Sequence, residues 1–206
     1  MKKLINKLKE LKKYNVVAIK QSLEDEGASF EEIKIMRMIT RKAGLQHNIK
    51  VGGCEAKTDI FFCEKVGVNG IVAPMVETSY GLRKFIQILN DNKKQNLYVN
   101  IESINAFNNI NKILKSKDFK KLTGLVIGRS DLAGSLNLEK SEVDSKRIFK
   151  LVKNLLKKIK KNKKIVTKMG GSLTPNSLDF VRKLFKNNLL DRVETRNIEI
   201  KLSKKV

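Results

Sequence analysis

The feature that most constrains the fold of this chain is a regular alternation of short apolar runs with longer stretches whose apolar residues have helical spacing. Seven runs rich in Val, Ile and Leu occur, and each is followed by a helical pattern. They cover residues 15–21, 48–51, 70–74, 97–101, 122–127, 164–168 and 191–200. Apolar strands that are each followed by a helix are typical of a parallel sheet covered by helices. The pattern therefore predicts an α/β fold.

Helix boundaries can be located from local signals. Ser29, with Glu32 three residues later, forms a capping-box pattern, and Gly44 ends the helix after Ala43. Thr174 followed by Pro175 is typical of a helix start. Residues 130–143 read instead as a long polar loop.

Two architectures fit this alternation, a doubly wound open sheet and a TIM-type (β/α)8 barrel. No G-x-G-x-x-G turn follows the first strand, which disfavours a dinucleotide-binding sheet. Polar residues and glycines gather at the strand ends, and in a barrel those ends converge on one face. We therefore expect a single barrel domain over residues 1–206, with seven βα units visible and the eighth strand not identified.

The N-terminal segment predicts an amphipathic helix over residues 1–13. Its apolar residues Leu4, Ile5, Leu8 and Leu11 have helical spacing, and lysines interrupt the continuous apolar run that a secretory signal needs. No apolar run approaches the roughly 18–20 residues of a membrane span. We expect a cytoplasmic protein without a membrane partner.

The formal net charge of +23 first suggests a nucleic-acid-binding protein. The basic excess is nearly all lysine, Asn and Ile are also abundant, and aromatic residues are not interleaved with the basic ones. Stacking platforms for bases are therefore missing from the pattern. Compositional bias explains the charge better, and we expect no specific nucleic-acid partner. A basic polyanion-binding barrel stays as an alternative.

Two carboxylates stand where strand ends are expected. Glu102 directly follows the strand at 97–101, and Asp131 lies in the loop after the strand at 122–127. A hard divalent cation such as Mg²⁺ is commonly held by one or two carboxylates, with water and substrate oxygens completing its shell. The alternative is that both residues only cap the helices that follow them.

Three stretches together resemble one enzyme family. They are VGGCEAKTDIFFCEKVGVNGIVAPMVET at 51–78, VNIES at 99–103 and GLVIGRSDLAGSL at 124–136. In this order and spacing the chain resembles the HpcH/HpaI aldolase/citrate lyase family over roughly residues 16–200. The resemblance implies a TIM-type barrel and a metal-dependent carbon–carbon lyase or aldolase. Its substrate would be a 2-keto acid or related carboxylate, converted through a metal-bound enolate.

The resemblance also implies residue roles. The family's strand-end glutamate and its Gly-x-x-Asp-Leu aspartate hold Mg²⁺ or Mn²⁺, and these motifs match Glu102 and Asp131. The backbone N–H groups of Gly128, Arg129 and Ser130 would hold the substrate carboxylate. Barrels of this family often assemble, so a homo-oligomer is expected.

The chain departs from the family at two catalytic positions. Lys50 stands where the aldolases keep an oxyanion-stabilising arginine, and it lacks the bidentate fork of that residue. The family's Glu-His pair is replaced by the acidic run 24–26, so Glu24 or Glu26 becomes the candidate base. The one histidine, His47, precedes a strand and is expected at the opposite end of the barrel. These departures favour a second alternative, a family member that binds metal and ligand without turnover.

A few other residues remain candidates. Lys168 and Arg196 are expected at strand ends, where they would bind a distal substrate anion or form salt bridges of the barrel rim. Cys54 and Cys63 belong to no C-x-x-C pair, which argues against zinc binding and cysteine catalysis. Cys63 is expected in the core.

Overall fold

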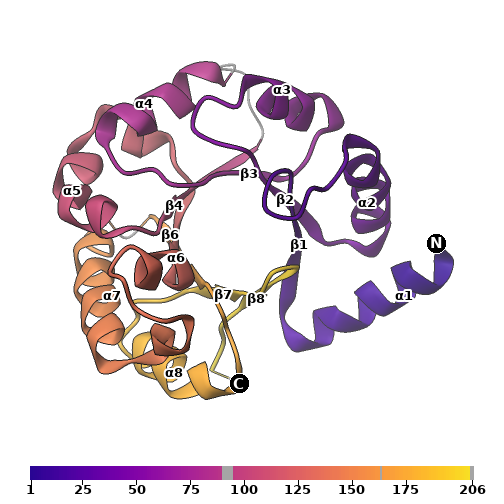
Figure 1. Ribbon diagram of the computed structural model, residues 1–206. Coiled ribbons are helices and arrows are strands. Elements are labelled where there is room, and N and C mark those ends of the chain that lie inside the picture. The colour runs from indigo at the N-terminus through magenta and orange to yellow at the C-terminus, as the bar shows by residue number, and fades with distance from the viewer. Residues whose placement is uncertain (90–94, 163, 205–206) are drawn as a thin grey trace.

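The computed structural model describes residues 1–89, 95–162 and 164–204. Within these residues, eight strands close into a barrel in the order β1 to β8 (Figure 1). The strands are β1 (Val16–Ser22), β2 (Gln46–Lys50), β3 (Gly70–Ala73), β4 (Asn96–Ile101), β5 (Gly124–Gly128), β6 (Val166–Gly170), β7 (Arg192–Glu194) and β8 (Ile198–Lys201). The prediction of a TIM-type barrel is confirmed.

Helices form a ring around the barrel (Figure 1). They are α1 (Lys2–Leu11), α2 (Phe30–Ala43), α3 (Lys57–Val66), α4 (Ser79–Ile88), α5 (Ile104–Lys115), α6 (Arg129–Gly134), α7 (Lys146–Ile159) and α8 (Leu178–Lys186), with the 3₁₀ turns η1 (Lys12–Tyr14), η2 (Lys117–Lys121), η3 (Lys140–Asp144) and η4 (Pro175–Ser177). The prediction of a long loop at 130–143 is wrong, because α6 and η3 occupy most of these residues. Among the described residues, no helix combines the length and the apolar character needed to cross a membrane.

The helix boundaries read from caps agree with the structure. The Ser29 hydroxyl accepts a hydrogen bond from the N–H of Glu32, whose carboxylate accepts one from the N–H of Ser29. Gly44 ends α2 in the left-handed region, at φ 70°. Thr174 caps η4, which leads into α8. Each of these signals acts through hydrogen bonds or backbone conformation within a few residues, so it can be read without the tertiary structure.

The last strand departs from the prediction. Residues 191–200 were expected as one strand, and this is wrong: they form the hairpin of β7 and β8. Thr195 donates its N–H to the carbonyl of Ile198 across the turn, at 2.9 Å. As a result β8 runs antiparallel to both β7 and β1, whereas β1 to β7 are parallel neighbours. The turn contains no Gly or Pro, so the sequence pattern showed no break.

Helix α1 covers the outside of the barrel near β8 and β1. Leu8 of α1 is buried in a cluster with Val16 and Ile19 of β1, and Ile198 and Ile200 of β8 pack against it. Leu4, expected in the apolar stripe, remains 38% exposed. The N-terminal helix therefore covers the wall next to the strand that no helix follows among the described residues.

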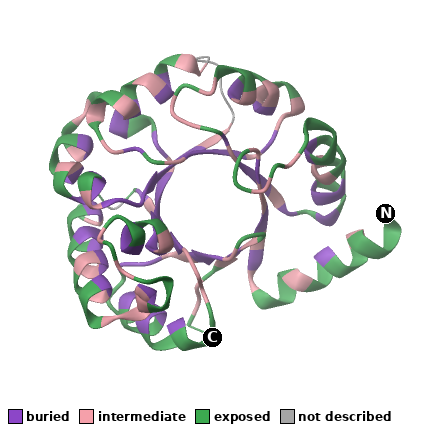
Figure 2. Ribbon diagram, in the orientation of Figure 1, coloured by how far each residue is buried: buried purple, intermediate pink, exposed green. Residues whose placement is uncertain are grey.

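The two faces of the strands differ in chemistry. Ile71, Val99 and Ile127 belong to the main apolar core between strands and helices, and Cys63 is buried there as expected. Figure 2 shows this burial on the helix sides that face the barrel. The alternate residues Val72, Tyr98 and Val126 form a separate small apolar cluster inside the barrel. Asn48, Lys168 and Glu199 are also buried, and both Asn48 and Lys168 donate to Glu199, so this part of the interior is polar.

A buried ionic network fills part of this interior. Lys168 of β6 donates to Glu199 of β8 at 2.6 Å, and Arg192 donates to the same carboxylate at 2.6 Å. The Lys168 ammonium also lies 3.3 Å from the ring centroid of Tyr98. Burial opposes ionisation of Glu199, but the two cations outweigh it and hold its pKa below the ordinary value. Through the hairpin, Glu199 thus neutralises the buried Lys168 and the half-buried Arg192.

This network corrects the expected position of Lys168. The strand predicted at 164–168 is observed at Val166–Gly170, so Lys168 lies in the middle of β6 and not at its end. Its side chain points into the barrel interior and is fully buried. It is not among the residues that line the cavity at the strand ends.

His47 should make the fold sensitive to acid. It is buried in β2, its Nε2 lies 3.0 Å from Oε1 of Gln21, and burial, assisted by the charge of Arg37, lowers its pKa to about 4. The unfolded chain binds this proton near pH 6.5, so stability falls as the pH drops from 6.5 towards 4. This group alone should cost about 2 kcal/mol at pH 5 relative to pH 7.5.

The measurement is urea unfolding at both pH values for the parent and for His47→Gln. The stability lost between pH 7.5 and pH 5 should be smaller in the variant by about 2 kcal/mol. Carboxylates that titrate in the same range act on both proteins and cancel in this difference. Equal losses would mean that His47 is protonated in the folded state.

Candidate active site

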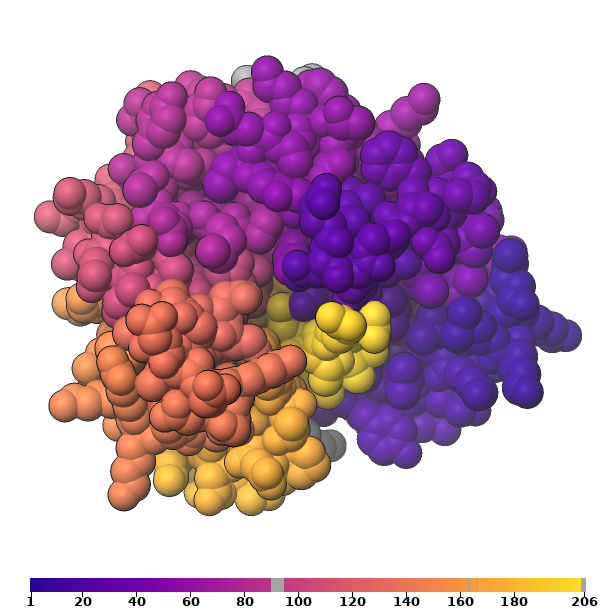
Figure 3. All heavy atoms as spheres, viewed as in Figure 1, coloured from indigo at the N-terminus to yellow at the C-terminus, as the bar shows by residue number. Residues whose placement is uncertain are grey.

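A cavity of about 580 Å³ opens at the carboxyl ends of the strands. Figure 3 shows the turn between β7 and β8, in yellow, at this mouth between the loop after β1 and the α6 region. Its lining residues are Lys20, Gln21, Ser22, Asp25, Glu26, Lys50, Asn100, Glu102, Val126, Gly128, Ser130, Asp131, Lys140, Gly170, Gly171, Ser172, Leu173, Glu194, Thr195 and Arg196. Only Val126 and Leu173 bring sizeable apolar side chains, so the cavity suits a small polar ligand.

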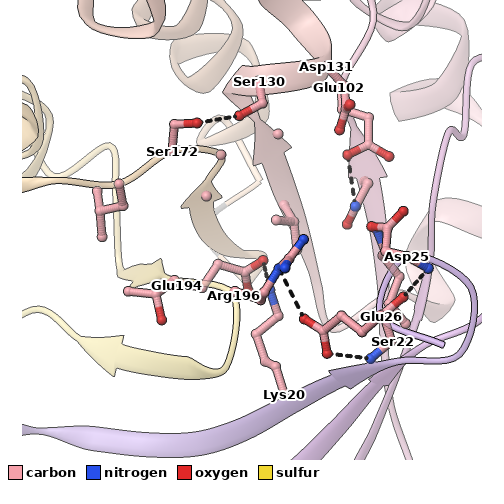
Figure 4. Close-up of a pocket in the computed structure, with 18 of the residues that line it drawn as sticks. Lys20, Ser22, Asp25, Glu26, Glu102, Ser130, Asp131, Ser172, Glu194 and Arg196 are labelled. Atoms are coloured by element: carbon pink, nitrogen blue, oxygen red, sulfur yellow. Dashed lines mark hydrogen bonds and ion pairs between the residues drawn. The ribbon is translucent and has the colours of Figure 1, made fainter. Parts of the chain in front are cut away.

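Glu102 and Asp131 lie next to each other in this cavity (Figure 4). Glu102 follows β4 and is 3% exposed, whereas Asp131 is in the first turn of α6 and exposed. Both oxygens of Glu102 accept a hydrogen bond, one from the N–H of Met75 and one from Nδ2 of Asn100, each at 2.9 Å. These two donors hold the carboxylate in one orientation.

The electrostatics of Glu102 suit a cation. Burial raises its pKa; the N–H of Met75 opposes that shift, and the charge of Asp131 adds to it. A positive ion between the two carboxylates would remove this repulsion. Met75 itself has φ 52°, an uncommon conformation for a residue with a side chain. That conformation aims its N–H at Glu102.

The donor set fits a magnesium-type ion better than zinc. Among the residues that the structure describes, no group of three or more His, Cys, Asp or Glu side chains could hold a metal. Two carboxylates with room for water and substrate oxygens are what Mg²⁺ commonly uses, whereas structural zinc takes four protein ligands. The Oδ1 of Asn100 is buried without a hydrogen-bond partner beside Glu102, and it can accept from a metal-bound water.

Glycines keep the surroundings of these carboxylates free of side chains. A Cβ on Gly128 would collide with the Glu102 carboxylate. Gly171, at φ 82°, lies so close to α6 that its Cβ would be 2.6 Å from the nitrogen of Arg129 and 2.5 Å from that of Ser130. Both N–H groups stand at the start of a helix, where no intrahelical acceptor exists. A side chain at position 171 would therefore cover both amides.

Lys50 ends β2 and lines the same cavity, as its place in the sequence suggested. It forms an ion pair with Asp25 in the loop after β1. Burial lowers the pKa of Lys50, whereas the negative charges of Glu102 and Asp131 oppose that shift. The ammonium group is therefore within electrostatic reach of both carboxylates.

The structure separates the acids of the run 24–26. Asp25 and Glu26 line the cavity, whereas Glu24 packs its side chain against Gly52 and is not among the lining residues. Glu26 accepts a hydrogen bond from the N–H of Ser22 at 3.2 Å and lies 3.6 Å from Nε of Arg196. Glu24 is therefore not brought to the site, and Asp25 is.

The side chain of Arg129 does not reach the cavity, although the residue lies between the lining residues Gly128 and Ser130. Its side chain is fully buried and forms an ion pair with Asp144. The guanidinium also donates to the carbonyls of Gly170 and Gly171, at 3.2 and 2.9 Å. The Arg129 side chain therefore ties the end of β6 and the residue after it to α6. Ser130, by contrast, turns its hydroxyl into the cavity, 2.9 Å from that of Ser172 (Figure 4).

Sequence reasoning missed several cavity residues. Lys20 and Glu194 form an ion pair at the cavity floor, although 174 positions separate them in the chain. Asn100, Lys140 and Ser172 also face the cavity. The alternation along β1 could have indicated Lys20, because it has the same parity as Ala18 and Ser22. His47 is absent from the lining residues, in agreement with the prediction.

Comparison of the fold with solved structures shows the same architecture. An HpcH/HpaI aldolase from Desulfitobacterium hafniense DCB-2 superposes with a TM-score of 0.74 at 11% identity, over 93% of this chain and 81% of that chain. A Burkholderia cenocepacia J2315 protein of the HpcH/HpaI aldolase/citrate lyase family gives 0.73 at 12%, over 93% and 82%. The citrate synthase SbnG gives 0.69 at 13%, over 87% and 78%. At these identities the likeness establishes the fold alone.

The sequence comparison is more specific. No curated protein matches the chain significantly. The sequence profile of the HpcH/HpaI aldolase/citrate lyase family matches residues 50–167, more than half of the chain. That segment runs from Lys50 to the start of β6 and contains eight of the twenty cavity-lining residues, among them Lys50, Glu102 and Asp131. The chain therefore belongs to the HpcH/HpaI aldolase/citrate lyase family.

Proposed function

We propose that the protein is a divalent-metal-dependent carbon–carbon lyase or aldolase that acts on a 2-keto acid or related carboxylate through an enolate. The observation that carries this proposal is the pair of carboxylates, Glu102 and Asp131, beside Lys50 at the strand ends of a family barrel. In such barrels catalytic residues come from the ends of several strands. Mg²⁺ or Mn²⁺ is the ion that the donor set suits.

We assign separate roles in this reaction to the residues of the cavity. Glu102 and Asp131 would hold the cation, which when bound supplies electrophilic stabilisation of negative charge on the keto oxygen. Lys50 contributes a second positive charge on the developing oxyanion. The N–H groups of Gly128, Arg129 and Ser130 orient the substrate carboxylate, and a Cβ at Gly171 would block those of Arg129 and Ser130.

Proton transfer falls to the loop after β1. Of the acids in that loop, Glu26 lines the cavity without an ion pair as tight as that of Asp25 with Lys50. We assign the proton-transfer role to Glu26, in place of the histidine that the family uses. Glu24 packs against Gly52 and does not line the cavity, so it is not assigned this role.

Exchange of the pyruvate methyl protons in D₂O tests this function directly. The methyl signal in the NMR spectrum should decay with protein and Mg²⁺ or Mn²⁺, and should persist with EDTA. Acetone, which lacks the carboxylate, is the matched control and should not exchange faster than in buffer. No exchange at any metal concentration, with metal binding intact, would support the ligand-binding alternative without turnover.

A further inference from the structure

Positive charge gathers on the outside of the barrel at α5, α7 and α8, which Figure 1 shows as neighbours along one side. Helix α5 contacts α7, and the rings of Phe149 of α7 and Phe180 of α8 meet edge to face, with centroids 4.9 Å apart. The sequences of the three helices contain a single acid, Asp179. Their exposed cations, which we call the basic wall, are Lys112, Lys115, Lys146, Arg147, Lys150, Lys157, Lys158, Arg182, Lys183 and Lys186.

This charge is more localised than the composition of the chain explains. The chain has 44 Lys and Arg residues for 21 acids, yet residues 145–178 contain eleven cations and no acid, where the average ratio would give about five. Helices α2 and α7 allow the same comparison at equal length, because each has 14 residues. Helix α2 carries four cations and two acids, whereas α7 carries six cations and no acid. A uniform lysine bias would not separate the two helices in this way.

The cations of α7 form a line and are not neutralised by the protein. Lys146, Lys150, Lys153 and Lys157 follow one another at intervals of four, three and four residues, which places them along one face of the helix. At 1.5 Å per residue this line is about 16 Å long. Within the described part of the chain none of the six cations of α7 forms an ion pair, and the first that does is Lys160, just beyond the helix. A ligand with a row of negative charges therefore finds unpaired partners here.

The side chains of the basic wall restrict the class of anionic ligand. The apolar face of α7 is already used, because Ile148, Val152 and Leu155 are buried in the main core. Of the large apolar side chains on the three helices, only Leu178 at the start of α8 is exposed. A basic patch without an apolar or lipid anchor does not hold a membrane stably. A single leucine also offers no ring on which a nucleic-acid base could stack.

The type of cation points the same way. Eight of the ten cations of the basic wall are lysines, and only Arg147 and Arg182 are arginines. Lysine presents a compact point charge, whereas the planar fork of arginine is the group that most often reads base edges in nucleic acids. The basic wall is therefore suited to a ligand that is recognised by its charge alone.

We propose that the basic wall binds a linear phosphate polymer without bases, of which inorganic polyphosphate is the simplest. Such a chain is flexible, so it can follow the curved outside of the barrel from α7 onto α5 or α8, which a flat bilayer cannot do. None of the ten cations is among the residues that line the cavity at the strand ends. The site is therefore separate from the proposed active site, and its test does not depend on turnover.

Fluorescence anisotropy of labelled long-chain inorganic polyphosphate, titrated with the full-length protein, tests this proposal. At about 0.15 M salt the parent should bind polyphosphate more tightly than it binds oligo(dT), duplex DNA or vesicles of phosphatidylcholine and phosphatidylserine, at equal concentrations of phosphate groups. The affinity should fall as salt rises, because each lysine–phosphate contact releases counterions. Tighter binding of either nucleic acid or of the vesicles would overturn the assignment of the ligand.

The triple variant Lys150→Gln/Lys157→Gln/Lys158→Gln locates the site on α7. Its affinity for polyphosphate should fall tenfold or more, and the slope of log K against log salt should become shallower by about 2, because a single-stranded polyanion contributes about 0.7 per contact. Glutamine has nearly the helix propensity of lysine, so α7 should stay folded.

A second triple variant, Lys42→Gln/Lys57→Gln/Lys65→Gln, is the matched control. It removes the same charge from exposed positions of α2 and α3, which lie across the barrel from α7 in Figure 1. Its affinity for polyphosphate should stay within about twofold of the parent, because salt screens charges that lie more than a Debye length from the ligand. Equal losses in the two variants, or no loss in the α7 variant, would show that binding follows net charge and would overturn the proposal.

Discussion

Glu102→Gln and Asp131→Asn should each abolish the stabilisation that Mg²⁺ or Mn²⁺ gives the parent protein. An ion present at 100 times its Kd stabilises the folded state by about 2.7 kcal/mol. For a chain of this size that corresponds to an increase in Tm of about 5–10 °C. With one of two carboxylates gone, the affinity should fall so far that the same concentration has no measurable effect. Metal-dependent exchange of pyruvate protons should disappear in parallel.

The stability of the two variants without metal separates loss of metal binding from loss of folding. Burial and Asp131 both disfavour the charged form of Glu102, so neutral Gln at this position should not destabilise the apo protein. Asn100 can rotate its amide and offer its unpartnered Oδ1 to the new amide group. Glu10→Gln on α1 and Asp179→Asn on α8 are exposed controls with the same change of charge. If both cavity variants respond to metal as the parent does, these are not the ligands.

Lys50→Ala should remove most of any turnover. Loss of one preorganised oxyanion donor typically costs about 2.7–4 kcal/mol, or roughly 10²–10³ in kcat. Lys50→Arg should preserve or raise the rate, because the guanidinium restores the group that the family's aldolases use. The rate of pyruvate proton exchange, measured at saturating metal, gives the comparison.

The ion pair with Asp25 offers the control for Lys50. Asp25→Asn breaks the same pair but keeps the ammonium in the cavity. If Lys50 acts on the substrate, Asp25→Asn should retain activity while Lys50→Ala loses it. Rates within about twofold of the parent in Lys50→Ala would instead make Lys50 a structural partner of Asp25.

Local patterns predicted much of the scaffold. The capping box at Ser29 and the glycine at 44 set the ends of α2, because both act through hydrogen bonds and backbone conformation within a few residues. The carboxylates at 102 and 131 could be placed in one cavity from sequence, because all parallel strands of a barrel end at the same face. Parallel strands also explain why Lys50 could be expected beside them.

Contacts between distant parts of the chain decided the rest. No local signal distinguishes Glu24 from Asp25 and Glu26, because the curve of the loop after β1 selects which acids face the cavity. Lys168 moved from an expected rim position into the interior because Glu199, on the reversed β8, neutralises it there. Ion pairs between distant strands, such as that of Lys168 with Glu199, form and stabilise the protein only once the barrel has closed. The sequence by itself therefore determined which elements form and at which end the chemistry lies, and the tertiary structure alone decided which charges meet.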